Sequence, residues 1–599
     1  MAYIRKTNIY ILLVENKRLF CYAFLWGIPF AISCVLGWRL VHEGTVFGNG
    51  GPATVYVGSF LLFLLETAVL SVPAAALAAF VIRGKAAVET TVKSAKGRRP
   101  VWQVWLFYSL LIFLVWVPVF LAYYPSVFAY DAEGQLYQVL AGDYSTHHPL
   151  LHTLFLGAFF RLGIGLGSCS AGMAVHSVVQ MALMACTFGR ALSFLYQRQV
   201  SRWVRALLLF FAVFPANSVL AMSTTKDVLF AALVLLYTLS FYRAVCGHSE
   251  AFGWSAEADR KEMAACVFWA VLMLLFRNNA VYAFVVSAPV IYIGLGKKRH
   301  RENRVQEAGV QNSDNGQKKK ARERRAWSGR AAGKTYLCMT LLMLVLYGVC
   351  AFSLKAVTHA RNGSPREMLS VPLQQMARTR VKAEEKIDPS LRRELEKYIS
   401  SEWVFAAYNP HLADPVKSRA VIHDDPVGLI KTWVKLGWKY PAIYIDAFLD
   451  NSLGLWYLWD TSHAQVYGMG TESGFGYLST DNRVMPAGFE VEEHSFLPGL
   501  RVFMEKIVSD NAYSKIPVVR LLFAPALYWW LLYLYIVTVL YRKRYREILP
   551  VVFLSAYCLT LLLSPTVLVR YIYPLMVTIP VILPCLMSDG ENDRCENIQ

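Results

Sequence analysis

The chain has 599 residues, 56% of them hydrophobic, and a formal net charge of +19 at pH 7. Several apolar segments reach the roughly 20 residues that a bilayer span needs, which excludes a soluble enzyme with one anchor. The charge does not indicate nucleic-acid binding, because the basic residues concentrate in a few short loops between apolar segments. The sequence therefore predicts an all-α polytopic membrane protein.

Residues 1–101 are predicted to contribute the N-terminal membrane-spanning helices. The short basic N-terminus runs into an apolar segment without a convincing cleavage site, so we interpret it as preceding a retained first span. Lysine and arginine residues between 83 and 101 place that loop in the cytoplasm. The next span then carries the loop 123–170 to the outer face.

About twelve spans follow from this pattern, with both termini in the cytoplasm. They cover about 19–41, 54–82, 102–122, 171–195, 204–222, 228–246, 262–276, 280–296, 335–357, 516–540, 548–564 and 571–587. Residues 149–167 admit two readings: a further span, which puts the basic stretch 197–205 outside, or an interfacial helix, which keeps it inside. His152, Arg161 and the short Gly-rich run favour the interfacial helix.

The rest of the chain divides by composition. Residues 102–296 are predicted to form a transmembrane core, and residues 297–334 a basic, disordered cytoplasmic loop. One span, 335–357, leads to an extracellular region of small-domain size, residues 358–515, which is expected to be mostly helical. Residues 516–599 supply the C-terminal spans.

Polar side chains gather at the outer ends of the predicted spans. Ionisable groups this close to a membrane boundary are costly and are usually kept for a function. Basic side chains there suit a lipid-linked phosphate, and a carboxylate facing them suits a general base or a metal ligand. The candidates are Asp131, Glu133, His147 and His148 in the first outer loop, then Lys226, Asp227, Arg277, Asn278, Arg570 and Tyr571.

Each candidate also has a plain structural reading. Asp131 and Glu133 can be solvated loop acids, although they lie among aromatic residues. The His-His-Pro sequence can be helix-entry chemistry, and the Lys226-Asp227 pair can cap the span that it begins. Arg570 can simply extend to the interface, but an outer arginine without a task is unfavourable under the positive-inside rule.

The order and sidedness of these motifs resemble the GT-C superfamily of membrane glycosyltransferases. That superfamily includes protein O-mannosyltransferases and the lipid A aminoarabinose transferase, and the likeness is greatest to an uncharacterised bacterial branch. It spans most of residues 100–587, and two extra N-terminal spans and the position of the outer region depart from the better-known members. The motifs are YDAEGQ (130–135), THHPLLHT (146–153), STTKD (223–227), FRNN (276–279), SVPLQQMAR (370–378) and RYIYPL (570–575).

The resemblance implies a GT-C-like core, within residues 102–296, that transfers a sugar from a polyprenyl-phosphate donor with inversion at the outer leaflet. Asp131 would deprotonate the acceptor hydroxyl, and Arg277, Arg570 or Lys226 would hold the phosphate. Gln374, Gln375 and Arg378 would contact the sugar or the acceptor; the plain reading is the polar face of a surface helix. Asp446, Asp450 and Asp460 can line a sugar site or be surface acids.

Cofactor and partners follow from the same resemblance. Asp131-x-Glu133 is similar to the acidic pair that binds a divalent cation, Mg or Mn, in oligosaccharyltransferases. Transferases with lipid monophosphate donors generally need no metal, so none is expected to be required. The expected partners are the lipid-linked donor, an envelope glycan, lipid or protein acceptor, and membrane lipids, but no nucleic acid, in a bacterial plasma membrane.

Two other functions compete with glycosyl transfer. A transporter or flippase of lipid-linked envelope precursors would carry polar or broken helices at mid-membrane, often with an internal repeat. An assembly scaffold would use residues 358–515 to bind a partner, which leaves the acids of the first outer loop unexplained. The transferase is favoured because the ionisable residues cluster at span ends.

Overall fold

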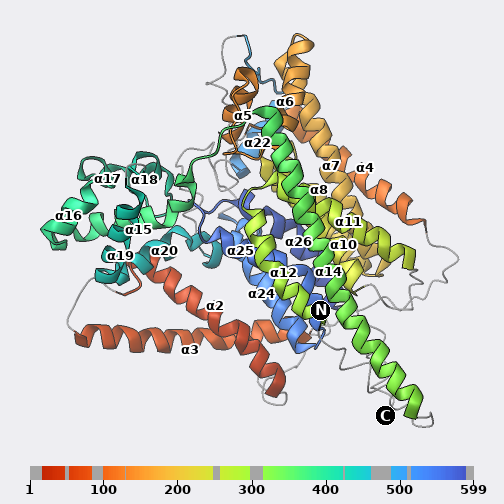
Figure 1. Ribbon diagram of the computed structural model, residues 1–599, viewed down its shortest axis with the longest axis horizontal. Coiled ribbons are helices and arrows are strands. Elements are labelled where there is room, and N and C mark those ends of the chain that lie inside the picture. Colours follow the sequence, from red (N-terminus) through yellow and green to blue (C-terminus); the bar gives the residue numbers. More distant parts are fainter. Residues whose placement is uncertain are drawn as a thin grey trace.

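The computed structural model describes nine ranges of the chain, and its regular structure there is helical apart from three isolated β-bridges (Figure 1). This confirms the predicted all-α class. The two termini, predicted to be cytoplasmic, and residues 297–314 lie outside the described part. The ranges are 17–47, 53–83, 99–128, 130–246, 256–296, 315–422, 425–459, 488–508 and 515–587.

Seven helices in these ranges are long and apolar enough to cross a membrane, so the chain is a multi-pass membrane protein. Each of them contains one of the predicted spans. They are α2 (Lys17–Glu43), α3 (Ala53–Arg83), α4 (Val101–Ala122), α7 (Cys169–Gln197), α10 (Lys226–Cys246), α14 (Asn315–Thr358) and α26 (Val569–Met587).

Two segments predicted as continuous spans, 204–222 and 516–540, are broken. Helix α8 (Ser201–Val213) meets α9 (Pro215–Met222) at 52°, and α23 (Pro517–Phe523) meets α24 (Pro525–Tyr541) at 75°. In both pairs a proline is the first residue of the second helix. At that position its missing N–H is not needed for a hydrogen bond, but the same proline cannot continue the preceding helix, which therefore ends. Counting each bent pair as one span gives up to nine in the described part.

Four further helices in the described part are not counted among the helices that are long and apolar enough to cross a membrane. Two of them, predicted as spans, have 17 and 13 residues and are shorter than the roughly 20 that a span needs. The expected total of twelve therefore exceeds the seven to nine found by length and composition. The four are α6 (Leu150–Gly165), α11 (Ala256–Phe276), α12 (Ala280–Gly296) and α25 (Leu549–Leu561).

The basic segment before the ninth predicted span differs from its expectation. We expected disorder throughout 297–334, but helix α14 already begins at Asn315 and continues without a break to Thr358. Residues 315–334 contain no proline, and their many alanine, lysine and arginine residues are good helix formers that outnumber the three glycines. The basic stretch therefore extends the apolar helix.

Helix α10 lies in the middle of the largest hydrophobic core and is buried over nearly its whole length. It packs against α7, α11, α25 and α26. Charged residues stand at its two ends, Lys226 and Asp227 at one and Arg243 at the other. The helix has 21 residues, which at about 1.5 Å each makes it about as long as a bilayer core is thick.

A separate group of short helices stands to one side of the long helices, above α2 and α3 in the view of Figure 1. It has its own hydrophobic core, which includes Leu373, Leu395, Leu436 and Tyr444. We call this group the outer bundle. It consists of η3 (Pro365–Leu369), α15 (Ser370–Ala383), η4 (Glu384–Lys386), α16 (Pro389–Glu396), α17 (Ser401–Ala407), α18 (Asp414–Arg419), α19 (Pro426–Lys439) and α20 (Pro441–Asn451).

Backbone and amide hydrogen bonds join the outer bundle to the loop that precedes α26. The Ala413 N–H donates to the Pro565 carbonyl at 2.8 Å, and the Asn451 amide donates to the Ser564 carbonyl at 2.8 Å. Helix α26 begins directly after this loop, at Val569, one residue before Arg570. The remaining helices are α5 (Tyr130–Ala141), α21 (Leu453–Trp456), α22 (Pro498–Val508) and η7 (Tyr545–Ile548).

Candidate functional site

Short backbone pairing brings the first outer loop to the start of α10. The Val127 N–H donates to the Met222 carbonyl at 3.4 Å, and the Thr224 N–H donates to the Val127 carbonyl at 3.0 Å. The Ser126 hydroxyl also donates to the Met222 carbonyl at 3.0 Å. These bonds satisfy backbone groups that the break after α9 leaves open, and they place Asp131 beside Lys226.

The His-His-Pro loop is held from two other sides. The Thr146 N–H donates to the Arg361 carbonyl at 2.8 Å, and the Gly363 N–H donates to the Thr146 hydroxyl at 2.9 Å. A Cβ at Gly363 would lie 3.1 Å from the His147 backbone, so a side chain there would press on the loop. The Asn278 amide donates to the Thr146 carbonyl at 3.0 Å. The segment after α14 and the turn after α11 thus fix this loop together.

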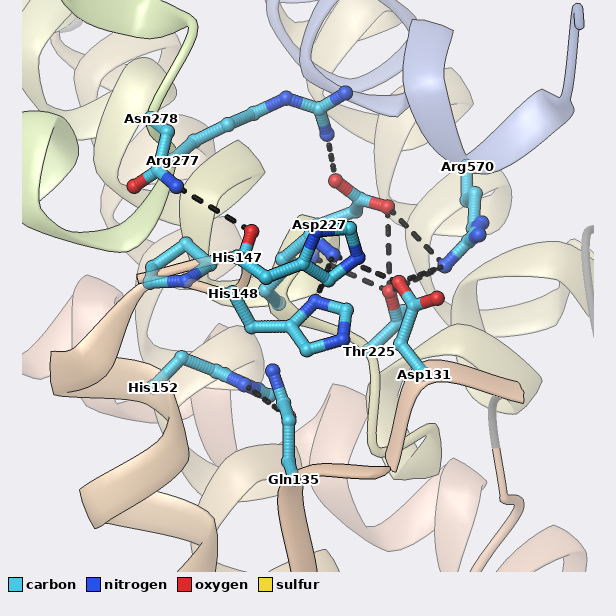
Figure 2. A network of polar contacts seen from close by, with 12 residues as sticks. Asp131, Gln135, His147, His148, His152, Thr225, Asp227, Arg277, Asn278 and Arg570 are labelled. Carbon is cyan, nitrogen blue, oxygen red and sulfur yellow. Dashed lines mark hydrogen bonds and ion pairs between the residues drawn. The ribbon is translucent and has the colours of Figure 1, made fainter. Parts of the chain in front are cut away.

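Asp131 accepts from two cations at once (Figure 2). Its Oδ2 lies 2.7 Å from the Lys226 ammonium and 3.3 Å from the Arg570 guanidinium. The same ammonium lies 3.3 Å from the Nδ1 atom of His148. An ammonium can only donate, so His148 accepts there and carries its proton on Nε2.

The second carboxylate, Asp227, lies deeper. It forms an ion pair with Arg277, and its Oδ2 atom is 3.6 Å from Arg570. The Thr225 hydroxyl donates to Asp227 at 3.2 Å and accepts from Arg570 at 3.1 Å. Arg570 therefore joins both carboxylates into one network.

Aromatic rings surround the arginine at the end of α11. The Arg277 guanidinium lies 5.5 Å from the ring centres of Phe230 and Tyr557 and 5.1 Å from that of Tyr571. Tyr571 is also 5.1 Å from the Arg570 guanidinium. Ring faces attract such cations, most strongly away from water. The predicted candidate Tyr571 thus packs between the two arginines.

The charges determine the protonation of the accessible groups. Burial alone would raise the pKa of Asp131, but the Lys226 and Arg570 charges outweigh it and hold that pKa well below its usual range. Burial and the neighbouring Lys226 ammonium lower the pKa of His148 to about 3. At neutral pH the network therefore contains an ionised Asp131 and a neutral His148.

A family model covers most of the chain, over residues 139–305 and 323–597, and is described as a family of unknown function, DUF6020. The chain belongs to this family. The part that matches includes every candidate discussed so far except Asp131 and Glu133, which precede it. No curated protein and no solved structure matches the chain significantly.

In this DUF6020 protein, Asp131 and Glu133 both lie in the first turn of helix α5 but point to different sides of it. Positions two apart on an α-helix point about 200° away from each other, so Glu133 does not share the face of Asp131. Asp131 is already occupied by two cations. The acidic pair that the resemblance linked to a possible divalent cation is therefore divided between two faces of α5.

The candidates in SVPLQQMAR lie on α15 in the outer bundle and form a second cluster. Arg378 is buried and forms an ion pair with Asp450, and it donates to the Tyr408 hydroxyl at 3.2 Å and to the Gly44 carbonyl at 2.7 Å. Burial, opposed by Arg378, raises the pKa of Asp450. The reading of this segment as the polar face of a surface helix is wrong for Arg378 and Gln374, which are 3% and 1% exposed.

The two glutamines of the DUF6020 chain hold neighbouring elements together. The Gln374 amide donates to the Asn409 carbonyl at 2.7 Å. Gln375 donates to the Tyr444 carbonyl at 3.1 Å and accepts from the Trp433 indole at 2.8 Å. These bonds connect α15 to α19 and α20, and none of them reaches the Asp131 network.

Of the three acids that we considered for a sugar site, the structure describes Asp446 and Asp450. Asp446 and Asp450 are buried at 5% exposure each, so neither is a plain surface acid. Asp446 accepts from the Val46 N–H at 3.0 Å, which joins the outer bundle to the loop after α2. Asp460 lies outside the described residues.

Sequence reasoning missed two parts of the site. Thr225 belongs to the STTKD motif but was not singled out, although a hydroxyl beside a Lys-Asp pair is a natural bridge. His152 entered only as an argument for an interfacial helix. It is fully buried and bonds to the Gln135 amide oxygen at 3.0 Å, beneath His148 in the view of Figure 2. A buried polar pair on α5 and α6 is not visible in the local pattern.

Proposed function

We propose that this protein is an integral membrane glycosyltransferase. It moves a sugar from a polyprenyl-phosphate donor to a cell-envelope glycan, lipid or protein at the outer face of a bacterial plasma membrane. The observation that carries the proposal is the convergence of Lys226, Arg277 and Arg570 on Asp131 and Asp227 at one end of α10. Three cations with two carboxylates leave one positive charge for a lipid-linked phosphodiester.

The position of the charges along α10 supports chemistry at a membrane surface. The Asp131 network lies at the N-terminal end of this helix, and the Arg243–Glu262 pair, with a 3.0 Å contact, lies at its other end. Because the helix is about as long as the bilayer core is thick, the two groups of charges fall near opposite interfaces. The basic loops assign the Asp131 end to the outside.

The proposed reaction is a single displacement. The acceptor oxygen bonds to the anomeric carbon while the bond from that carbon to the phosphate oxygen breaks, with inversion. The acceptor proton passes to Asp131, and the polyprenyl phosphate leaves with the bonding electron pair. Lys226 and Arg570 stabilise the charge that grows on the departing phosphate, which is an electrostatic role for fixed cations.

The proposal includes a GT-C-like transmembrane core and about twelve spans, in which α11, α12 and α25 complete the bundle around α10. The packing of these three helices on α10 or on one another supports it. No metal is required in this scheme, because Lys226, Arg277 and Arg570 supply the positive charge. Both termini are placed in the cytoplasm.

A transporter or flippase of lipid-linked precursors is the second candidate. The observation in its favour is the pair of broken spans, since transporters often build substrate sites from discontinuous helices. One of these breaks leads through α9 directly to Ser223 and the Lys226-Asp227 turn. A transporter would move the lipid across the bilayer without breaking the sugar–phosphate bond.

The two functions are separated by one assay on the full chain in liposomes. Radiolabelled polyprenyl-phosphate sugars and a membrane extract are supplied, and label is followed both into the acceptor and across the bilayer. We expect label in the acceptor with the wild type and none with Asp131→Asn. The control is Asp143→Asn, whose carboxylate pairs with Arg361 in an exposed position, and it should transfer normally. Label that crosses the bilayer unchanged would favour the flippase.

A further inference from the structure

Each cation of the network already has a carboxylate partner. Lys226 is paired with Asp131, Arg277 with Asp227, and Arg570 with both carboxylates. A phosphate entering this site does not meet a free cation among the three. The phosphate has to share a cation with a carboxylate or displace the carboxylate from it. Displacement is favoured at the ion pair that is most accessible from outside.

Exposure distinguishes the two carboxylates. The Asp131 side chain is 21% exposed and its partner Lys226 is 18% exposed. Asp227 is 1% exposed, and its partners Arg277 and Arg570 are 9% and 2% exposed. An anion from outside therefore reaches the Lys226–Asp131 pair first, whereas removing a partner from the buried Asp227 pairs would leave an uncompensated buried charge.

The Lys226–Asp131 ion pair also conflicts with the proposed role of Asp131 as a general base. A general base works best when its pKa lies near the working pH. With Lys226 and Arg570 in contact, the pKa of Asp131 is held well below its usual range, so it binds an acceptor proton poorly. If a phosphate draws Lys226 away, the carboxylate loses the ammonium charge that does most to lower its proton affinity.

We propose, building on the glycosyltransferase function above, that the donor phosphate displaces Asp131 from Lys226 and that only the displaced carboxylate activates the acceptor. The Lys226–Asp131 ion pair is then the inactive state of an empty site. Donor binds before acceptor is deprotonated, and the carboxylate and the phosphate compete for one ammonium.

Competition between the carboxylate and the phosphate predicts that Asp131→Asn, although inactive in transfer, binds polyprenyl phosphate more tightly than the wild type does. The probe is polyprenyl phosphate without a sugar, titrated against the full chain in lipid nanodiscs. If the pair occupies Lys226 for about nine-tenths of the time, Asp131→Asn should bind the probe about tenfold more tightly than the wild type. Asp143→Asn removes the same charge from the same outer loop and should leave the affinity unchanged.

A second measurement uses the wild type alone, in case the Asn variant does not fold. Infrared difference spectra recorded on adding polyprenyl phosphate should show a changed carboxylate stretching band, because Asp131 leaves its ion pair. Asp131→Glu, which keeps the charge, should retain a wild-type-like affinity.

The outcomes separate this inference from the function beneath it. Equal or weaker probe binding by Asp131→Asn, or an unchanged carboxylate band in the wild type, overturns the displacement and leaves the transferase proposal standing if transfer is seen. Failure of every form of the protein to bind polyprenyl phosphate overturns the proposed donor class itself.

Discussion

The ammonium of Lys226 lies 2.7 Å from the carboxylate of Asp131, although 95 positions separate the two residues in the chain. Backbone pairing of the segments just before them holds this contact. Asp131 lies in the first turn of α5, and Lys226 begins α10, which is buried over nearly its whole length. The pair therefore connects the accessible outer loop to the centre of the fold.

Replacing Lys226 by Gln should damage transfer more than it damages folding. The variant removes the most accessible positive charge next to Asp131, and the loss of one preorganised charge of this kind costs about 100-fold in rate. The measurement is kcat/KM for a lipid-linked donor, with the melting temperature recorded alongside. A variant that keeps wild-type kcat/KM would show that Lys226 does not act on the phosphate.

Acid should weaken the fold through His148. Its pKa is about 3 in the folded chain and near 6.5 when exposed, so the unfolded chain binds more protons between these values. Stability should therefore fall as the pH is lowered from 6.5 towards 3. His148→Gln should make this decline shallower in a series of melting temperatures across that range. An identical slope in the variant would contradict a neutral His148 ring in the folded chain.

Arg378→Gln should destabilise the outer bundle and its attachment to the α2–α3 hairpin. It leaves Asp450 buried without its cation and frees the Gly44 carbonyl, and breaking a buried ion pair typically costs about 3–5 kcal/mol. Thermal unfolding checks this, with Lys435→Gln as the control. Lys435 pairs with Glu394 in an exposed position, and its removal should leave the melting temperature unchanged.

Gly172 should not accept a larger residue, because α6 and α7 touch there. A Cβ on Gly172 would lie 2.6 Å from the Gly163 Cα atom, so Gly172→Val has to push α6 away from α7. Overpacking of this kind costs about 1–3 kcal/mol. Because α6 begins beside the His-His-Pro loop, transfer should fall as well. The control is Gly165→Ala at the end of α6, where a Cβ has open space around it; this variant should behave like the wild type in both assays.

The sequence was enough to predict most of the long helices and the side of the fold where the candidate residues meet. Hydropathy identifies α2, α3, α4 and α7 because a run of apolar residues has one main explanation. It could not show the bends before Pro215 and Pro525, since the two halves of each bent pair together are long and apolar enough to pass for one span.

Some members of the Asp131 network were predictable from the sequence, but the pairing between them was not. The predicted topology brought Asp131, Lys226 and Arg570 to one face, because it puts the segment after α4 and the starts of α10 and α26 on the same side of the membrane. Which cation pairs with which carboxylate depends on backbone pairing far from these residues. The burial of Arg378 was hidden because its partner Asp450 lies 72 positions away in another helix.

The bonds from the outer bundle to the loop before α26 decide how this protein can be divided. Ala413 and Asn451 hold Pro565 and Ser564, while Arg361 and Gly363 hold Thr146 on the other side of the site. An expression fragment that ends before Arg361 would lack Arg570 altogether and would lose the bonds that hold Thr146 beside His147. Structural and enzymatic work on isolated pieces would thus report on a damaged site, so the full-length chain is the smallest useful sample.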